Sequence, residues 1–341
     1  MTDLIVHRGG PHLTVQDTGR PGYLAFGVSR GGAMDRLALA EGAALLGQSN
    51  ERAAVEMAGS GGLFEVTDAR LIALTGAPMR VEVDGAALAW NASHLLPAGA
   101  RLSIGGALHG TYGYLHFGGG VAASKQLGAR ATHVAVGLGQ TLATGARVPL
   151  GTDRCDGDVG RAMDPEDRFS GGTVRIVPSL QTELFPEAEL SRFQATGFRR
   201  DPRSNRMGAR LICEGDGFFG VAGLSVLSEV ITPGDVQITG DGTPFVLMAE
   251  CQTTGGYPRI GTVIPADMPR VAQAGRDAVL RFRFIELEEA VTIERTDRTA
   301  LLSLPRRVRR LVRRPEEMRD LLTYQLISGV TNGDDLERLP A

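Results

Sequence analysis

The sequence feature that most limits the fold is a series of short β-forming runs between residues 53 and 150. Tight-turn pairs such as Gly61-Gly62, Asp84-Gly85 and Gly105-Gly106 separate these runs. Strands that recur about every 8–12 residues indicate a β-barrel or a β-sandwich. The 46 glycines and 17 prolines favour the same architecture, because few long helical periods remain between them. The expected strands cover residues 54–57, 63–66, 71–74, 79–83, 86–89, 102–104 and 112–117.

At 341 residues the chain is long enough for two packed domains, because a domain commonly holds about 100–200 residues. Hydrophobic residues make up 43% of the chain and charged residues 22%, which is ordinary for a globular protein. The formal net charge of −3 argues against a nucleic-acid partner. Lys125 is the only lysine among 36 basic residues, so we give single arginines little weight as functional signals. A P-loop lysine motif for phosphate is absent from the sequence.

Cysteine, histidine and hydropathy patterns indicate a cytoplasmic protein without a metal. Cys155, Cys213 and Cys251 are odd in number and form no CxxC pair, which is typical of free thiols in a reducing compartment. The six histidines show no HExxH or other metal-ligand spacing. The N-terminus lacks an apolar signal region, and no run approaches the roughly 18 apolar residues of a membrane span. We therefore expect no membrane association.

Polar side chains are embedded in a glycine-rich stretch, VQDTGRPGYLAFGVSRGGAMD, at residues 15–35. Gln16 and Arg20 lie among glycines that indicate either close approach of the backbone to a ligand or a chain of tight turns. An Ala/Leu-rich helix is expected from Asp35 to about Leu46. A carboxylate is favourable at a helix start. Asp35 is therefore interpreted as a helix cap, as a site residue, or as both.

An acidic segment at residues 151–172 has almost no apolar pattern, and we interpret it as an exposed linker. The segment lacks the EF-hand spacing for calcium. It separates an N-terminal β-barrel subdomain, residues 1–150, from a second one, residues 173–288. The second subdomain is expected to begin with a strand at 174–177 and a helix at 187–196. Arg206 and Arg210 follow, four residues apart, and can hold a carboxylate or phosphate or be merely solvated.

Residues 228–258 predict two strands joined by a hairpin turn at 239–243, which contains Asp-Gly. Antiparallel pairing places Gln237 in the first strand and brings Glu229 close to residues 252–254. Glu229 is by its position the best general acid or base of this region, although charged residues at strand ends are usually only solvated.

The sequence ECQTTGGYPRI at residues 250–260 follows an apolar strand and presents neutral hydrogen-bonding groups in a row. Gln252, Thr253 and Thr254 come first, and Gly255-Gly256 then breaks the strand ahead of Tyr257 and Arg259. Glycine at such a bend lets another backbone or a ligand approach closely. We interpret the stretch as a site for a planar polar substrate; the alternative is an ordinary tight turn.

Residues 289–341 form a helical C-terminal extension by their periodicity. The sequence PRRVRRLVRR, residues 305–314, carries six arginines with apolar residues between them. A basic amphipathic helix of this kind contacts anionic membranes or partners in some proteins. The following acidic residues and the arginine-rich composition favour salt bridges within the chain instead.

Five motifs resemble one known family in order and content: QDTGRPGY with GVSRGGAMD, LTGA, RSNRMGARL, SEVITPGDVQITGDGTP and ECQTTGGYPRIGTV. The chain is similar from about residue 6 to residue 284 to the biotin-dependent carboxyltransferase, or allophanate hydrolase subunit 2, family, which includes the C subunit of bacterial 5-oxoprolinase. Gly31, Thr239 and Glu250 stand where the family often has serine, proline and aspartate. These departures bear on the identity of the substrate.

The resemblance implies a mainly β fold with two cyclophilin-like β-barrel subdomains. It also implies an ATP-dependent amide- or lactam-cleaving hydrolase that converts 5-oxoproline to glutamate. The chain would be one subunit, inactive alone, with a smaller allophanate hydrolase subunit 1-like partner and a lactamase-like third subunit. A urea or allophanate carboxyltransferase using carboxybiotin is one alternative. A regulator that binds a kinase inhibitor, without enzymatic activity, is another.

Residues and resemblance converge on small amides, ureas or lactams, which present flat donor and acceptor edges. Arginine at such a site can stabilise a carboxylate, an acyl phosphate or an oxyanion. The predicted catalytic residues are Glu229, Gln252, Thr254 and Arg259. The predicted substrate-binding residues are Gln16, Arg20, Asp35, Arg206, Gln237, Thr253, Gly255, Gly256 and Tyr257.

Overall fold

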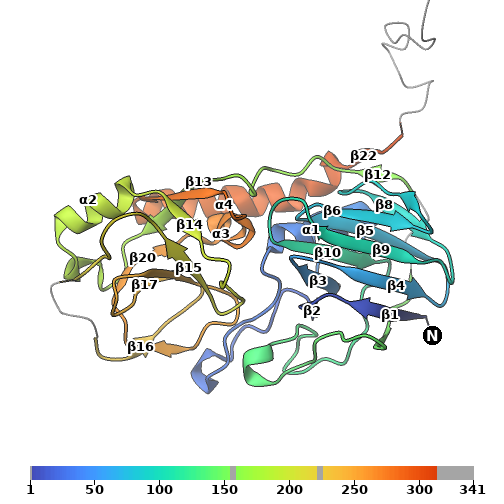
Figure 1. Cartoon of the computed structure of the whole chain (residues 1–341), viewed down its shortest axis with the longest axis horizontal. Helices are drawn as coiled ribbons and strands as arrows, with labels where there is room; N and C mark the ends of the chain where they lie inside the picture. The colour runs from blue at the N-terminus through green and yellow to red at the C-terminus, as the bar shows by residue number, and fades with distance from the viewer. Residues whose placement is uncertain (1, 154–158, 221–225, 313–341) are drawn as a thin grey trace, which may run out of the picture.

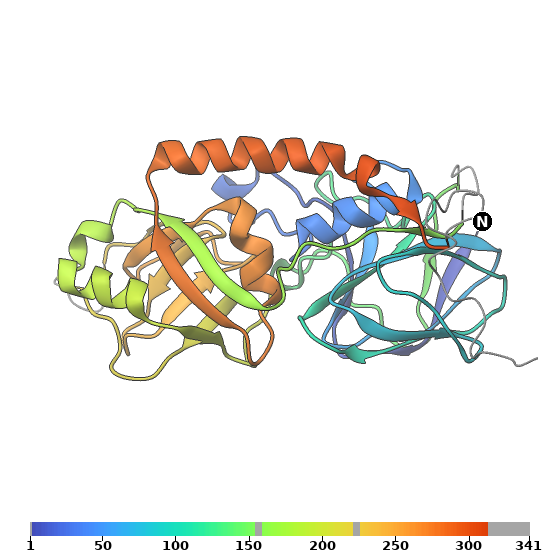
Figure 2. The same cartoon turned by 90° about the horizontal axis from the view of Figure 1, so that it is seen from above.

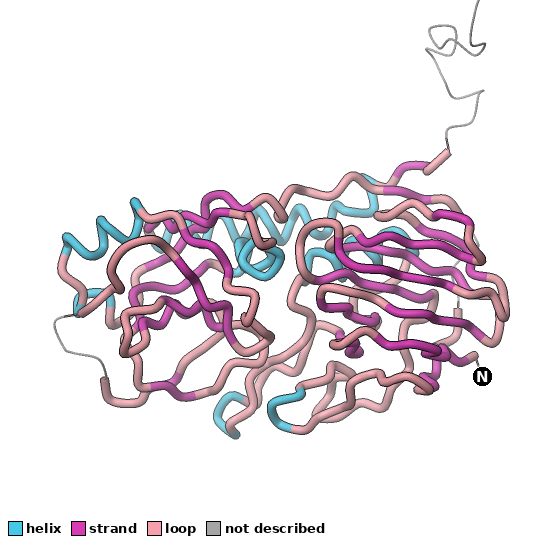
Figure 3. Tube along the Cα trace, viewed as in Figure 1, coloured by secondary structure: helices cyan, strands magenta, loops and turns pink. Residues whose placement is uncertain are grey.

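The computed structural model describes residues 2–153, 159–220 and 226–312 and contains two β-rich lobes side by side (Figure 1). Strands fill both lobes, and most helices lie along one side of the molecule (Figure 3). The mainly β prediction is thus confirmed. Helix α4 (Leu287–Ser303) runs across both lobes (Figure 2). No helix in the described ranges is long and apolar enough to cross a membrane.

The N-terminal lobe consists of two antiparallel sheets that pack face to face. The first sheet has the order β11-β1-β4-β9-β6-β7 and the second β2-β3-β10-β5-β8. Apolar side chains of both sheets, among them Val6, Phe64 and Leu74, form one buried core. The bounds are β1 Asp3–Gly9, β2 Leu13–Gln16, β3 Ala54–Ala58, β4 Gly62–Val66, β5 Arg70–Gly76, β6 Met79–Val83, β7 Ala86–Ala87, β8 Ser93–Leu96, β9 Leu102–Ala107, β10 Tyr112–Phe117 and β11 Arg147–Pro149.

The C-terminal lobe is a closed barrel with the strand order β13-β20-β17-β18-β15-β14-β21. Helix α2 (Glu187–Ala195) inserts Phe193 between Phe198 and Phe282, with ring centroids 5.0 and 5.1 Å away. Strands β17 and β18 pair antiparallel, which confirms the predicted hairpin. The bounds are β13 Gly171–Val177, β14 Phe198–Arg200, β15 Gly208–Ile212, β17 Asp235–Ile238, β18 Pro244–Leu247, β20 Arg259–Val263, β21 Val279–Phe284 and α3 Met268–Gln273.

Helix α1 (Arg36–Leu46) covers one face of the second N-terminal sheet, against β5 and β10. The carboxylate of Asp35 accepts a hydrogen bond of 3.0 Å from the backbone N–H of Ala38, so the predicted helix cap is confirmed. Gly42 lets the helix approach the sheet, because a Cβ there would lie 2.3 Å from the ring of His116. The helix ends at Gly47, which adopts the left-handed conformation.

The acidic segment 151–172 is less exposed than expected. Met163, Arg168 and Phe169 are buried, and the prediction of a fully exposed linker is wrong for these residues. Burial is possible because the Arg168 guanidinium binds two carboxylates, those of Asp35 and Glu41. Strand β12 (Arg161–Ala162) also pairs with β22 (Arg309–Arg310). Cys155 lies outside the described residues, whereas Cys213 and Cys251 are free thiols as predicted.

The arginine-rich segment after α4 does not continue as a helix. A 3-10 turn, η5 (Leu304–Arg307), is followed by strand β22, and residues 313–341 lie outside the described ranges. Pro305 limits helix continuation because it lacks a backbone N–H. Arg307 and Arg309 form ion pairs of 2.6 Å each with Glu166 and Asp164. The predicted intramolecular salt bridges are therefore confirmed, whereas the predicted helix is limited to the 3-10 turn at residues 305–307 and is wrong over residues 308–312.

His116 makes stability depend on pH. Burial lowers the pKa of His116 from 6.5 to about 3, and its Nε2 lies 2.8 Å from the hydroxyl of Thr75. Between these pKa values the unfolded chain binds the proton and the folded chain does not, so stability falls as pH falls below 6.5. We expect His116→Gln to remove up to about 1.4 kcal/mol per pH unit of this slope. Urea denaturation of the wild type and of His116→Gln between pH 6.5 and 5 measures this slope. Equal slopes for the two proteins would contradict the lowered pKa of His116.

Candidate functional site

Segment 247–252 lies between the lobes and separates two cavities. Met248 and Ala249 line a cavity between the lobes. Cys251 and Gln252 line another beside barrel strands β15, β17 and β18, which we name the barrel-mouth pocket. Residues 250–252 of this segment are the start of the stretch 250–260 that the sequence singled out. Its predicted companions fall into separate groups around it, which we describe in turn.

The first group is a buried ion cluster centred on Arg206, which joins the two lobes. Arg206 Nε lies 2.5 Å from Glu250, its Nη1 binds Glu56 of β3, and its Nη2 donates to the carbonyl of Gly32 over 2.7 Å. Tyr114 donates to Glu56 over 2.6 Å. Burial alone would lower the pKa of Arg206, but the two carboxylates raise it above its usual value. Arg206 is consequently a fixed cation within this cluster.

A hydroxyl, an imidazole and a carboxylate stand in a row beside the cluster. Ser29 Oγ lies 2.8 Å from His133 Nε2, and His133 Nδ1 lies 3.7 Å from Glu250 Oε2. This order is the one that activates serine in many hydrolases. Ser29 is only 1% exposed, however, so its hydroxyl is closed to a substrate in this structure. Burial lowers the pKa of His133, Glu250 opposes this shift, and Arg20 and Arg206 add to it.

Gln16 and Arg20 hold the loop that carries His133. Gln16 Nε2 donates to the carbonyl of Thr132 over 3.1 Å, and Arg20 Nη2 donates to that of Ala131. Both side chains are buried, and Gln16 Oε1, Arg20 Nη1 and His133 Nδ1 have no hydrogen-bond partner among the described residues. Sequence reasoning missed Ser29 and His133, because they are more than a hundred residues apart. The glycines around Ser29 were the one local signal.

Asp35 belongs to a different buried network beneath α1. Its carboxylate lies 2.6 Å from Arg168 Nε and accepts a hydrogen bond of 2.8 Å from Gln273 Nε2. The side chain of Asp35 is fully buried and lines neither of the two cavities. Its position assigns it to the contact between the lobes.

The barrel-mouth pocket, a cavity of about 430 Å³, brings Gln237 and Gln252 together. A β-bulge between Val236 and Gln237 shifts the register of β17 against β20, and bulges re-aim side chains. Gln237 Nε2 is buried without a hydrogen-bond partner among the described residues. A Cβ on Gly255 would lie 2.6 Å from this nitrogen, so glycine leaves room for the amide. The pocket also contains Ser204, Asn205, Arg210 and Cys251.

A small ribbon brings Glu229 to the predicted segment. Strands β16 (Glu229–Val230) and β19 (Thr254–Gly255) pair antiparallel, with Glu229 opposite Gly255. Arg259 Nη2 lies 2.5 Å from Glu229 and its Nη1 lies 3.4 Å from Asp235, so its charge is already balanced. Thr253, Thr254, Gly256 and Tyr257 lie on or beside this ribbon and are not among the described residues that line the barrel-mouth pocket.

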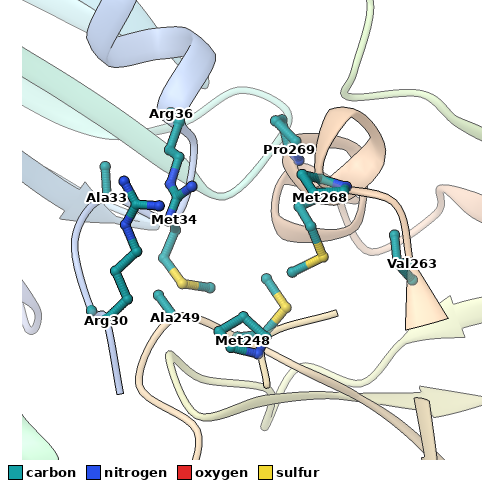
Figure 4. A pocket seen from close by; sticks show the side chains of 12 residues that line it. Arg30, Ala33, Met34, Arg36, Met248, Ala249, Val263, Met268 and Pro269 are labelled. Carbon is teal, nitrogen blue, oxygen red and sulfur yellow. The ribbon is translucent and has the colours of Figure 1, made fainter. Parts of the chain in front are cut away.

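The cavity between the lobes measures about 240 Å³ and is lined by Arg30, Met34, Arg36, Met248, Met268 and Pro269, among others (Figure 4). Neither Arg30 nor Arg36 was predicted as a site residue, because the arginine-rich composition obscured them. In the described ranges, no group of three His, Cys, Asp or Glu side chains is placed to hold a metal ion.

Comparisons with known proteins bear on the family and the fold. The family described as carboxyltransferase domain, subdomain A and B, matches residues 26–284. The 5-oxoprolinase C subunit of Escherichia coli is 33% identical over 293 residues, which cover 84% of this chain and 93% of the relative. The C subunit of the Haemophilus influenzae 5-oxoprolinase is 31% identical, with 83% and 91% covered. The fold matches the crystal structure of K. lactis urea amidolyase with a TM-score of 0.80 and 22% identity; the match covers 89% of this chain and 20% of that one.

Removal of Arg206 tests the ion cluster. Glu56 and Glu250 are 1% and 3% exposed, and Arg206→Met leaves both carboxylates buried without their cation. We expect a loss of about 3–5 kcal/mol in the free energy of unfolding, measured by urea denaturation. Arg147→Met is the matched control, since its guanidinium is 59% exposed and pairs with Asp3 at the surface; its expected effect is below about 1 kcal/mol. Similar small losses in both variants would contradict a lobe-joining role for Arg206.

Proposed function

The chain belongs to the carboxyltransferase domain family of subdomains A and B, and we propose that it is a subunit of an ATP-dependent hydrolase that opens 5-oxoproline to glutamate. The similarity to two 5-oxoprolinase C subunits, over more than nine-tenths of their lengths, supports this choice of substrate. The hydrolase acts on a carbon–nitrogen bond other than a peptide bond. We further propose that the subunit acts with a smaller paralogous partner and a lactamase-like third subunit.

The observation that carries the proposal is the unpartnered amide of Gln237 at the wall of the barrel-mouth pocket. A buried amide N–H without an acceptor is costly, and a bound ligand carbonyl would remove that cost. 5-Oxoproline presents a lactam carbonyl and N–H on one flat edge. Gln237 Nε2 supplies the donor for the carbonyl, and the amide of Gln252 lines the same pocket.

Arg210 is placed for the carboxylate that 5-oxoproline carries beside its lactam. It lines the barrel-mouth pocket, and its Nη1 lies 2.7 Å from Asp201. A guanidinium offers five donors, so one carboxylate partner does not exhaust it. In this proposal Gln237 and Gln252 hold the lactam and Arg210 orients the acid. Arg259 and Glu229 keep the ribbon and Gly255 in place, and Thr254 faces the subunit that completes the site.

Reconstitution tests this function. The chain is co-expressed with its two partner subunits, and ATP-dependent glutamate release from 5-oxoproline is measured. We expect activity only with all subunits, and at least a tenfold rise in KM for 5-oxoproline in Gln237→Ala, since about 1.4 kcal/mol corresponds to tenfold. Gln140→Ala is the matched control, because Gln140 is an exposed glutamine outside the pocket.

Gly255→Ala provides a second variant in the same assay. The added methyl would contact Gln237 and Ile231, both flexible side-chain ends that can shift without unfolding the barrel. We expect KM to rise as in Gln237→Ala, whereas Gly106→Ala, whose Cβ would meet the Gly59 carbonyl oxygen at an ordinary contact distance of 3.9 Å, leaves KM unchanged. A stable complex without turnover would overturn the 5-oxoproline assignment and direct the test to urea with a biotin carrier.

A further inference from the structure

We propose that the cavity between the lobes is an anion-binding site in which Arg30 and Arg36 hold the phosphoryl group of a nucleoside phosphate. The two arginines come from the end of the glycine-rich loop and from the first turn of α1. Their guanidinium groups lie side by side on one wall of the cavity (Figure 4).

The two guanidinium groups repel each other in the free chain. The pKa of Arg36 is lowered to about 10, first by burial in the cleft and second by the charge of Arg30. Arg36 keeps an accessible surface even so, as expected for a group inside an open cleft. Because the two positive charges repel each other, binding of an anion between them is favourable.

No carboxylate in the described part of the chain balances this pair. Arg168, Arg206 and Arg259 each bind two carboxylates. By contrast, Arg30 donates only to the carbonyl of Thr18, over 3.0 Å, and Arg36 has no ion pair or side-chain hydrogen bond within the described ranges. Among the residues that the structure describes, no acidic side chain lines the cavity. The pair is therefore available to an external oxyanion.

The rest of the cavity selects a ligand with a flat, apolar body. Met34, Met248 and Met268 converge on its interior (Figure 4). Pro233 and Pro269 complete the apolar wall. Methionine sulfur contacts aromatic rings favourably. An aromatic base against the methionines with phosphate on the arginines fits this arrangement better than a small carboxylic acid does. The cavity adjoins a larger groove of about 800 Å³ beside α4, which shares Arg30 and Arg36. That groove is also lined by Arg295 and Arg298 and by the carboxylates of Glu294 and Asp297, so we assign the phosphoryl group to the cavity and not to the groove.

The choice of ATP as the nucleoside phosphate rests on the proposed function, whereas the anion site itself does not. The carboxylate of 5-oxoproline is a second oxyanion that two arginines can bind. Because segment 247–252 lines both this cavity and the barrel-mouth pocket, the two ligands would lie on opposite sides of one strand end.

Calorimetric titration of the full-length chain with ATP, and separately with 5-oxoproline, tests the site. We expect the double variant Arg30→Gln/Arg36→Gln to bind ATP at least tenfold more weakly than the wild type. Arg281→Gln removes the same charge from an exposed position on β21, outside both cavities, and is expected to leave ATP binding unchanged. Inorganic phosphate should raise the thermal unfolding midpoint of the wild type more than that of the double variant.

Three outcomes would overturn the inference. The wild type does not bind ATP, the double variant binds ATP with an affinity within twofold of the wild type, or the double variant loses 5-oxoproline binding and keeps ATP binding. Its failure is distinguishable from failure of the proposed function. If the complex turns over 5-oxoproline but ATP binding does not depend on Arg30 and Arg36, only the inferred site is contradicted. If ATP binding depends on these two arginines but 5-oxoproline is not turned over, only the proposed function is contradicted.

Discussion

The structure depends on one buried cation held between two anions from different lobes. Arg206 binds Glu56 of the N-terminal sheet and Glu250 of the segment that follows the barrel strand β18. Both carboxylates are nearly inaccessible to solvent, and Glu56 of the N-terminal lobe takes its cation from the C-terminal lobe. The ion cluster therefore fixes the lobes together and sets the course of residues 247–252 between them.

That fixed segment gives the two cavities different chemistry. Toward the N-terminal lobe it presents Met248 to the cleft with the unpaired arginines, and toward the barrel mouth it presents Gln252 beside the unpartnered amide of Gln237. An oxyanion suits the first cavity and a neutral amide edge suits the second. Under the proposed function, a reaction that couples ATP hydrolysis to lactam opening needs both kinds of recognition, and the two cavities would supply them on either side of one strand end.

Local signals in the sequence predicted local structure well. The cap at Asp35, the hairpin before Pro244 and the closeness of Glu229 to Gly255 follow from turn chemistry and strand alternation over a few residues. Contacts between distant segments left no such signal. The Ser29–His133–Glu250 row spans the whole fold. Arg307 pairs with Glu166 and Arg309 with Asp164, instead of lying in the predicted helix. Arginine-rich composition concealed which guanidinium groups lacked a carboxylate.

The central claim is that the barrel mouth recognises the lactam. Hydrogen exchange of backbone amides in the reconstituted complex, with and without 5-oxoproline, tests it most directly. The account predicts slower exchange on 5-oxoproline binding in residues 250–258 and 203–210, which line or adjoin the Gln237 pocket. Slower exchange confined to the N-terminal lobe, or no change at saturating 5-oxoproline, would contradict it.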